Sequence, residues 1–172
     1  MVTSSKIKGY RTAKTLLVVV LLSACANAQA QSLCDGLRSV LKDARNSFSN
    51  LRADFDFYLD EYRGTAKLGR FDECATESGK GVATYRCRRS GLPDDEIAAR
   101  NELQSAAAEI KACLGDGVKP SVGGSAPTKV SFKYVATDDE VAVRYGRIVP
   151  RRGQRSPFYY VVVQVTTVDL NR

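Results

Sequence analysis

The sequence predicts an α+β domain in which two helices cover one face of an antiparallel sheet of about five strands. Helical periodicity is confined to two segments, residues 33–52 and 91–115. Strand-like alternation comes in runs and does not alternate singly with helices, which favours antiparallel pairing. The predicted order is helix, hairpin, helix and three-stranded meander, joined by two disulfides. The 172 residues leave room for one domain, residues 31–172, after a leader over residues 1–30.

The leader has the features of an export signal. Its basic residues, Lys6, Lys8, Arg11 and Lys14, precede an apolar run over residues 16–22. That run is too short to span a bilayer, which needs about 20 residues, and a basic segment followed by a short apolar one is typical of a cleaved signal. We therefore expect an exported protein, either free in the periplasm or lipid-anchored to the membrane that faces it.

Two processing signals overlap at the end of the leader. Leu22-Ser23-Ala24-Cys25 resembles the signal of bacterial lipoproteins, and this resemblance implies cleavage before Cys25 and acylation of its thiol. Small residues at Ala26, Ala28 and Ala30 also fit ordinary signal peptidase, with cleavage before Gln29 or Gln31. The complete four-residue match and the short apolar run favour the lipoprotein cut. Contact with a membrane is expected only through a lipid on Cys25.

The positive charge of the chain is concentrated in the leader. The whole chain carries a net charge of +7, and no acidic residue occurs before Asp35. Once the four basic residues of the leader are removed, +3 remains for the domain. This value does not call for a polyanionic partner, so nucleic-acid binding is not expected.

A hairpin is predicted over residues 66–89. A two-residue turn at Lys80-Gly81 places Cys74 opposite Cys87 and Glu73 opposite Arg88. The same register places Asp72 opposite Arg89, so one alignment pairs two cysteines and two sets of opposite charges. We therefore expect a Cys74–Cys87 disulfide, because paired residues in an antiparallel ladder lie close enough for one.

The second disulfide follows from the two helices. An apolar side of the first helix is formed by Leu33, Leu37, Leu41, Ala44, Phe48 and Leu51, with Cys34 beside it. The second helix begins with Pro93 and three acids that suit the positive end of its dipole, and Gly115 ends it. Cys113 then lies in its last turn. If the helices pack antiparallel, Cys34 and Cys113 meet, and a Cys34–Cys113 bridge is expected.

The rest of the chain is predicted to be a connector and three strands. Residues 116–128 are rich in Gly, Ser and Pro and are expected to be flexible. A turn at Asp138-Asp139 would pair the apolar faces of the next two strands, in the combinations Ala136 with Val141, Tyr134 with Val143 and Phe132 with Tyr145. The β-branched run FYYVVVQVTTVDL is expected to be a central strand. Residues 52–64 favour neither a helical extension nor a loop.

Histidine is absent, which limits the available chemistry. No Ser-His-Asp or Cys-His system can be assembled, and histidine metal sites are excluded. The four cysteines are assigned to disulfides, and no phosphate-binding or dinucleotide-binding motif occurs. We therefore expect no catalytic residues, no cofactor and no metal.

Two charged clusters could carry a function. The acidic one comprises Asp54, Asp56, Asp60 and Glu61. It could supply a carboxylate pair for glycoside chemistry, or it could be a solvated helix end. The basic one comprises Arg144, Arg147, Arg151, Arg152 and Arg155, around the loop PRRGQRSP. It could bind an anionic partner, or it could be a solvated hairpin loop.

The sequence as a whole favours a non-enzymatic binding or interaction domain of the bacterial cell envelope. Its partner would be an envelope protein or an anionic envelope component, and the basic cluster is the first candidate surface. Two alternatives remain open. One is an enzyme that acts on the cell wall with paired carboxylates from residues 54–61, and the other is an enzyme inhibitor that acts through the arginine-rich loop.

Overall fold

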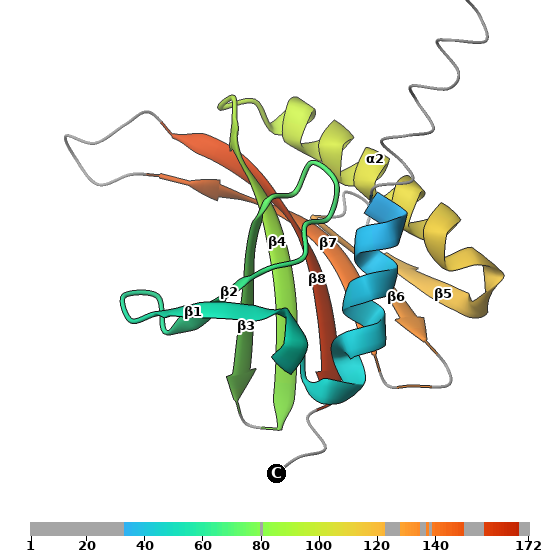
Figure 1. The fold of residues 1–172 in the computed structure, drawn as a ribbon. Helices are drawn as coiled ribbons and strands as arrows, with labels where there is room; N and C mark the ends of the chain where they lie inside the picture. The colour runs from blue at the N-terminus through green and yellow to red at the C-terminus, as the bar shows by residue number, and fades with distance from the viewer. Residues whose placement is uncertain are drawn as a thin grey trace, which may run out of the picture.

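Two helices lie on one face of an eight-stranded antiparallel sheet (Figure 1). The structure is a computed structural model and describes residues 33–79, 81–122, 128–134, 137, 139–149 and 157–168. The α+β class and the antiparallel sheet are confirmed, but the sheet has eight strands where about five were expected. The leader, including Cys25, Gln29 and Gln31, lies outside the described residues.

The chain runs through a short helical region, a first set of strands, a long helix and a second set of strands. The first helix covers residues 33–43 and is followed by the 3₁₀ turns η1 (Ala44–Asn46) and η2 (Ser49–Leu51). The next elements are β1 (Arg52–Asp56), β2 (Glu61–Gly64), β3 (Glu73–Gly79), β4 (Val82–Leu92), α2 (Glu96–Leu114) and η3 (Gly115–Gly117). The last are β5 (Val118–Val122), β6 (Lys129–Tyr134), β7 (Glu140–Ile148) and β8 (Phe158–Val168).

The sheet order is β1-β2-β3-β4-β8-β7-β6-β5. Helix α2 carries the chain from β4, near the middle of the sheet, to β5 at its far edge. Strands β6 and β7 then return toward the middle, and β8 lies between β7 and β4. The prediction that the last strand is central is therefore confirmed.

The first helix is shorter than predicted. It ends at residue 43, and Ser47 and Phe48 adopt positive φ angles of 51° and 59°, which no continuing helix allows. The buried Asp43 carboxylate organises the turns that follow: the Asn50 backbone N–H donates to its Oδ2 at 3.0 Å and the Asn50 side-chain amide to its Oδ1 at 2.6 Å. Residues 52–64, which favoured neither a helical extension nor a loop in the sequence analysis, form the hairpin of β1 and β2.

The expected connector over residues 116–128 contains an edge strand. Strand β5 pairs with β6 from Val118–Tyr134 to Val122–Val130. Pro120 fits this strand because an edge strand can accommodate a residue that lacks a backbone N–H. Residues 123–127 lie outside the described residues.

The two predicted hairpin registers had different outcomes. Strands β3 and β4 pair Cys74 with Cys87 and Glu73 with Arg88, as predicted, and Gly81 has a φ of 77° in the turn. Strands β6 and β7 are displaced by four residues from the prediction, since Phe132 pairs with Val141 and not with Tyr145. The turn is longer than two residues: the Tyr134 N–H donates to the Asp139 carbonyl oxygen at 3.1 Å. An even displacement keeps each apolar set on its face.

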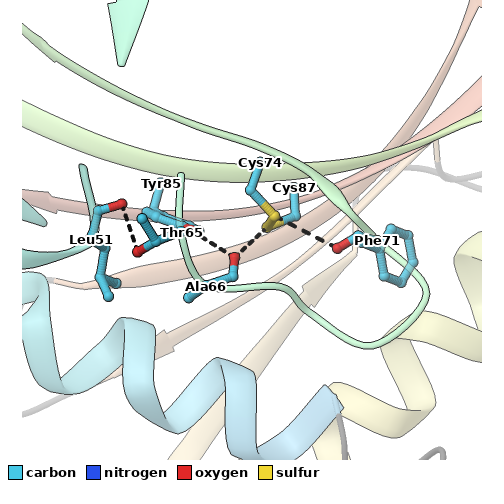
Figure 2. Close-up of a disulfide and its surroundings, with 7 residues drawn as sticks. All are labelled: Leu51, Thr65, Ala66, Phe71, Cys74, Tyr85 and Cys87. Carbon is cyan, nitrogen blue, oxygen red and sulfur yellow. Dashed lines mark hydrogen bonds between the residues drawn. A yellow bond between two sulfur atoms is a disulfide. The ribbon is translucent and has the colours of Figure 1, made fainter. Parts of the chain in front are cut away.

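Both expected disulfides are present. The Cα atoms of Cys34 and Cys113 lie 5.2 Å apart, and those of Cys74 and Cys87 lie 4.0 Å apart (Figure 2). The helices are not antiparallel neighbours. In Figure 1 they run at an angle to one another, so the Cys34–Cys113 bridge joins the start of one to the end of the other without side-by-side packing.

One apolar core lies between the helices and the sheet. Leu33, Leu37 and Val40 of the first helix are buried in it. They join buried residues of α2 and of the central strands, among them Leu103, Ile110, Tyr85, Val143, Val163 and Val165. At the start of α2, the Asp95 side chain accepts hydrogen bonds from the backbone N–H groups of Ile97 and Ala98, while Pro93 precedes the helix. Among the described residues, no helix is long and apolar enough to cross a membrane.

Candidate functional site

The second face of the sheet is left uncovered by the two helices. Strand side chains alternate between faces, so on β4 Tyr85 and Cys87 point into the core while Arg86 and Arg88 point to this uncovered face. A groove of about 610 Å³ lies there, between the β2–β3 side of the sheet and the β7–β8 side. We call it the arginine groove.

The arginine groove combines an apolar lining with charged walls. Its apolar lining is provided by Leu59, Ala75, Ile148, Val162 and the ring of Tyr160. The ring of Tyr160 has space because position 146 is glycine, where a Cβ would stand 2.5 Å from the Tyr160 hydroxyl. Its charged lining comprises five arginines and three acids, namely Arg63, Arg86, Arg88, Arg144, Arg147, Glu61, Asp72 and Glu73. The groove thus places charged side chains of both signs beside an apolar surface.

Most of these charges are already paired. Arg86 forms an ion pair with Glu61, and Arg88 forms one with Glu73 at 2.7 Å. Arg144 is different, because among the described residues no ion pair or hydrogen bond joins its exposed side chain to a partner. It lies opposite Lys129 in the β6–β7 ladder, and Lys129 is itself paired with Glu140 at 2.7 Å. The Arg144 guanidinium therefore has no carboxylate bound to it within the described part of the chain.

The structure describes two of the five arginines in the predicted basic cluster. Arg144 and Arg147 both line the arginine groove, but the Arg147 guanidinium is already bound to Asp94. Its Nε and Nη2 donate to Oδ1 and Oδ2 of Asp94, each at 2.7 Å, and these hydrogen bonds lower the pKa of Asp94. Arg151, Arg152 and Arg155 lie outside the described residues, so their part in the predicted cluster is not tested.

The predicted acidic cluster does not converge on one site. Asp54 is exposed on β1, and Asp60 lies in the β1–β2 turn with a φ of 54°. Asp56 accepts hydrogen bonds from the backbone N–H groups of Tyr58 at 3.0 Å and Leu59 at 3.3 Å, so its role is to shape the turn. Of the four acids only Glu61 lines the arginine groove, and it is paired with Arg86.

Sequence reasoning missed the tip of the β1–β2 hairpin. Phe57, Tyr58 and Leu59 are 86%, 99% and 64% exposed. We call residues 57–60 the hairpin tip; it projects from the left side of the molecule in Figure 1. The tip has a defined shape, because Phe57 stacks edge-on against Phe55 with ring centroids 5.0 Å apart. The signal available in the sequence was three consecutive large apolar residues flanked by acids.

Two further observations bear on the site. Among the described residues, no three His, Cys, Asp or Glu side chains are placed to hold a metal ion together. No family model, no curated protein and no solved structure matches the chain.

Proposed function

We propose that the protein is a non-enzymatic binding domain of the bacterial cell envelope that recognises an acidic protein segment in its arginine groove. The observation that carries the proposal is the Arg144 side chain, which no described residue pairs, beside an apolar lining. A carboxylate bound there would form a charge-assisted hydrogen bond, the stronger class of such bonds. The apolar lining would at the same time bury part of the segment.

The paired arginines support this recognition. A guanidinium has five N–H donors, so Arg88 keeps donors available after its contact with Glu73. Arg88 and Arg144 both lie on the uncovered face, on strands separated only by β8. An incoming carboxylate can therefore accept hydrogen bonds from Arg88 on one side of the groove and from Arg144 on the other.

The shape of the site favours a protein segment over a lipid surface. The lining is concave and includes the acidic Glu61, Asp72 and Glu73 on one side. An anionic bilayer is flat, and it would be repelled by these carboxylates. A narrow segment can place its acids against Arg144 and avoid them.

The arrangement gives little support to the alternative of a cell-wall hydrolase. Such an enzyme needs two carboxyl groups that converge on the substrate, one acting as acid and the other as base or nucleophile. Glu61 and Glu73 in the groove are each bound to an arginine. Asp54, Asp56 and Asp60, the other acids of the predicted cluster, do not line the groove.

The placement in the envelope is supported by the leader and by the two disulfides. A basic segment followed by a short apolar run is typical of exported chains. Disulfides persist in oxidising compartments such as the periplasm. Both features therefore support a location in the cell envelope.

Calorimetric titration of the processed chain with poly-L-glutamate tests the proposed recognition. We expect binding that weakens as salt is added, because the contacts are between exposed charges. Arg144→Ser should weaken it by about tenfold, the equivalent of one charge-assisted hydrogen bond.

Arg45→Ser is the matched control for this experiment. It removes the same charge from an exposed residue of η1, on the helix-covered side of the sheet, and should leave the affinity unchanged. Equal losses in the two variants would show that only net charge matters and would contradict a groove site. Tighter binding to vesicles of phosphatidylglycerol than to poly-L-glutamate would contradict the choice of a protein segment.

A further inference from the structure

The hairpin tip is an exposed apolar surface of the kind found in protein interfaces. Three consecutive large apolar side chains are exposed there, and Tyr58 is 99% exposed. Hydrogen bonds from the backbone N–H groups of Tyr58 and Leu59 to the Asp56 carboxylate fix the turn. Contiguous exposed apolar residues mark interaction sites, and rigid aromatic side chains often dominate the binding energy of an interface.

The negative charge of the tip indicates which kind of surface would bind it. Asp54 and Asp60 are exposed beside the three apolar residues, and Asp56 lies at the base of the turn. The complement of this tip is an apolar hollow with a positive rim. An anionic membrane would be repelled by the same acids.

The arginine groove of the same chain is a hollow with an apolar lining and arginines on its β4 and β7 sides. It offers Ile148 and the ring of Tyr160 for the apolar side chains, and Arg88 and Arg144 for the acids. The tip cannot enter the groove of its own chain, because Leu59 and Glu61 of this hairpin already form one of its walls. A tip that fills the groove must come from another molecule.

Tip and groove are neighbours in each chain, which allows a closed two-fold contact. Leu59 belongs to both surfaces. A two-fold axis passing near Leu59 would bring each tip to the groove of the other molecule. Such an isologous arrangement is closed and uses each surface once.

We propose that two copies of the chain form a dimer by reciprocal insertion of the hairpin tip into the arginine groove. The proposal rests on the proposed function, since it takes the groove as the recognition site and names its partner segment. Phe57 and Tyr58 contact the apolar lining of the partner, and Asp60 faces its Arg144. Because these charges are exposed, added salt weakens the dimer.

Sedimentation velocity of the processed chain over a range of concentrations measures the association. We expect a monomer–dimer equilibrium, and Tyr58→Ser or Arg144→Glu should each raise the dissociation constant by at least about tenfold. Ile97→Ser removes a side chain that is 72% exposed on α2 and should leave the constant unchanged. A chain that stays monomeric at all concentrations, or an equal effect of the Ile97 variant, would overturn the proposal.

Photo-crosslinking identifies the contact itself. The variant Tyr58→benzoylphenylalanine is mixed with an isotopically heavy wild-type chain and irradiated. We expect products between light and heavy chains that map to peptides of β4, β7 or β8 at the groove. Products that map to the helices or to β5, or products only with a different envelope protein, would overturn the dimer.

The two proposals can fail separately. A chain that is monomeric but binds poly-L-glutamate through Arg144 overturns the dimer and leaves the recognition groove in place. A chain that neither dimerises nor binds poly-L-glutamate overturns both. A dimer that forms equally well with Arg144→Glu overturns insertion into the groove, even if Tyr58 contributes to the contact.

Discussion

Tyr85 shows how single residues shape the sheet near the site. Its side chain is fully buried, and its hydroxyl donates a hydrogen bond to the Ala66 carbonyl oxygen at 2.6 Å (Figure 2). The sulfur of Cys87 lies 3.7 Å from the same oxygen but, as part of a disulfide, has no proton to donate. Residue 64 must be glycine because a Cβ there would stand 2.5 Å from the Tyr85 hydroxyl. Strand β2, a wall of the arginine groove, can thus approach β4 closely.

Replacing Tyr85 tests this arrangement. Tyr85→Phe removes the hydrogen bond to Ala66 and should lower the free energy of unfolding by about 1 kcal/mol, as measured with denaturant. Burial raises the pKa of Tyr85 from 10.0 to about 12, because the charged phenolate is poorly solvated there. A raised pKa in the folded state makes its stability contribution complete below pH 10, and this contribution is lost as the pH rises toward 12.

Comparing the stability of the two proteins at alkaline pH provides the control for that prediction. The wild-type chain should lose more stability than Tyr85→Phe between pH 10 and pH 12, where only the wild type has this phenol to ionise. Absorbance of phenolate should show one late-titrating tyrosine that the variant lacks. Identical alkaline profiles in both proteins would mean that Tyr85 is not held in its neutral form.

At the scale of elements, the β3–β4 hairpin could be predicted because several constraints agree. Its turn residues, its two cysteines and its opposite charges all require one register. For the β6–β7 hairpin, the alternation of apolar residues was the only evidence for the predicted register. Alternation fixes the face but not the register, so a displacement of four residues satisfied it equally well.

The strands that were missed lack a strong local signal. In β1 and β2, acids and arginines interrupt the aromatic residues, because these strands lie at an edge and one face is solvated. In β5, Pro120 and the glycines that follow suggest a loop, although an edge strand tolerates proline. Edge position is a property of the whole sheet and cannot be recognised within a short window of sequence.

The two disulfides should differ in their contribution to stability. Cys34 and Cys113 are 79 residues apart, while Cys74 and Cys87 are 13 apart within a hairpin whose other pairs already hold the register. Closing the longer loop removes more entropy from the unfolded chain. Replacing Cys34 and Cys113 with Ala should therefore destabilise the protein by about 1.5 kcal/mol more than replacing Cys74 and Cys87.

Guanidinium unfolding of the two double variants, with the wild type beside them, provides the measurement. Both variants should still fold, because one bridge remains in each. The opposite order of stability would show that packing around the buried Cys87 outweighs loop closure.

At the scale of the whole molecule, the site was predictable only in part. The basic character of residues 144–155 directed attention to Arg144, which lines the arginine groove. The sequence could not show that Arg86 and Arg88 of β4 share that groove, since this depends on strand order. It also could not show that residues 52–64 form a hairpin, so the exposure of the hairpin tip was not foreseen.

The lipid anchor predicted on Cys25 can be tested by intact-mass measurement of the mature chain. Cleavage before Cys25 should leave a mature chain whose intact mass includes lipid on that cysteine. Cys25→Ala should be cut before Gln29 or Gln31 and released without lipid, with the same unfolding midpoint, because the described fold begins after these positions. A wild-type chain that starts at Gln29 or Gln31 and carries no lipid would contradict the anchor.

The central position of β8 has a consequence for the order in which the protein can assemble. Strands β1 to β4 form one ladder and β5 to β7 form another, and of the strands that the structure describes β8 alone pairs with both. It is also the last strand along the described part of the chain. A chain that emerges from its N-terminus first therefore keeps two separate half-sheets until residues 158–168 are free. Completion of the fold is a single late event that depends on the final strand.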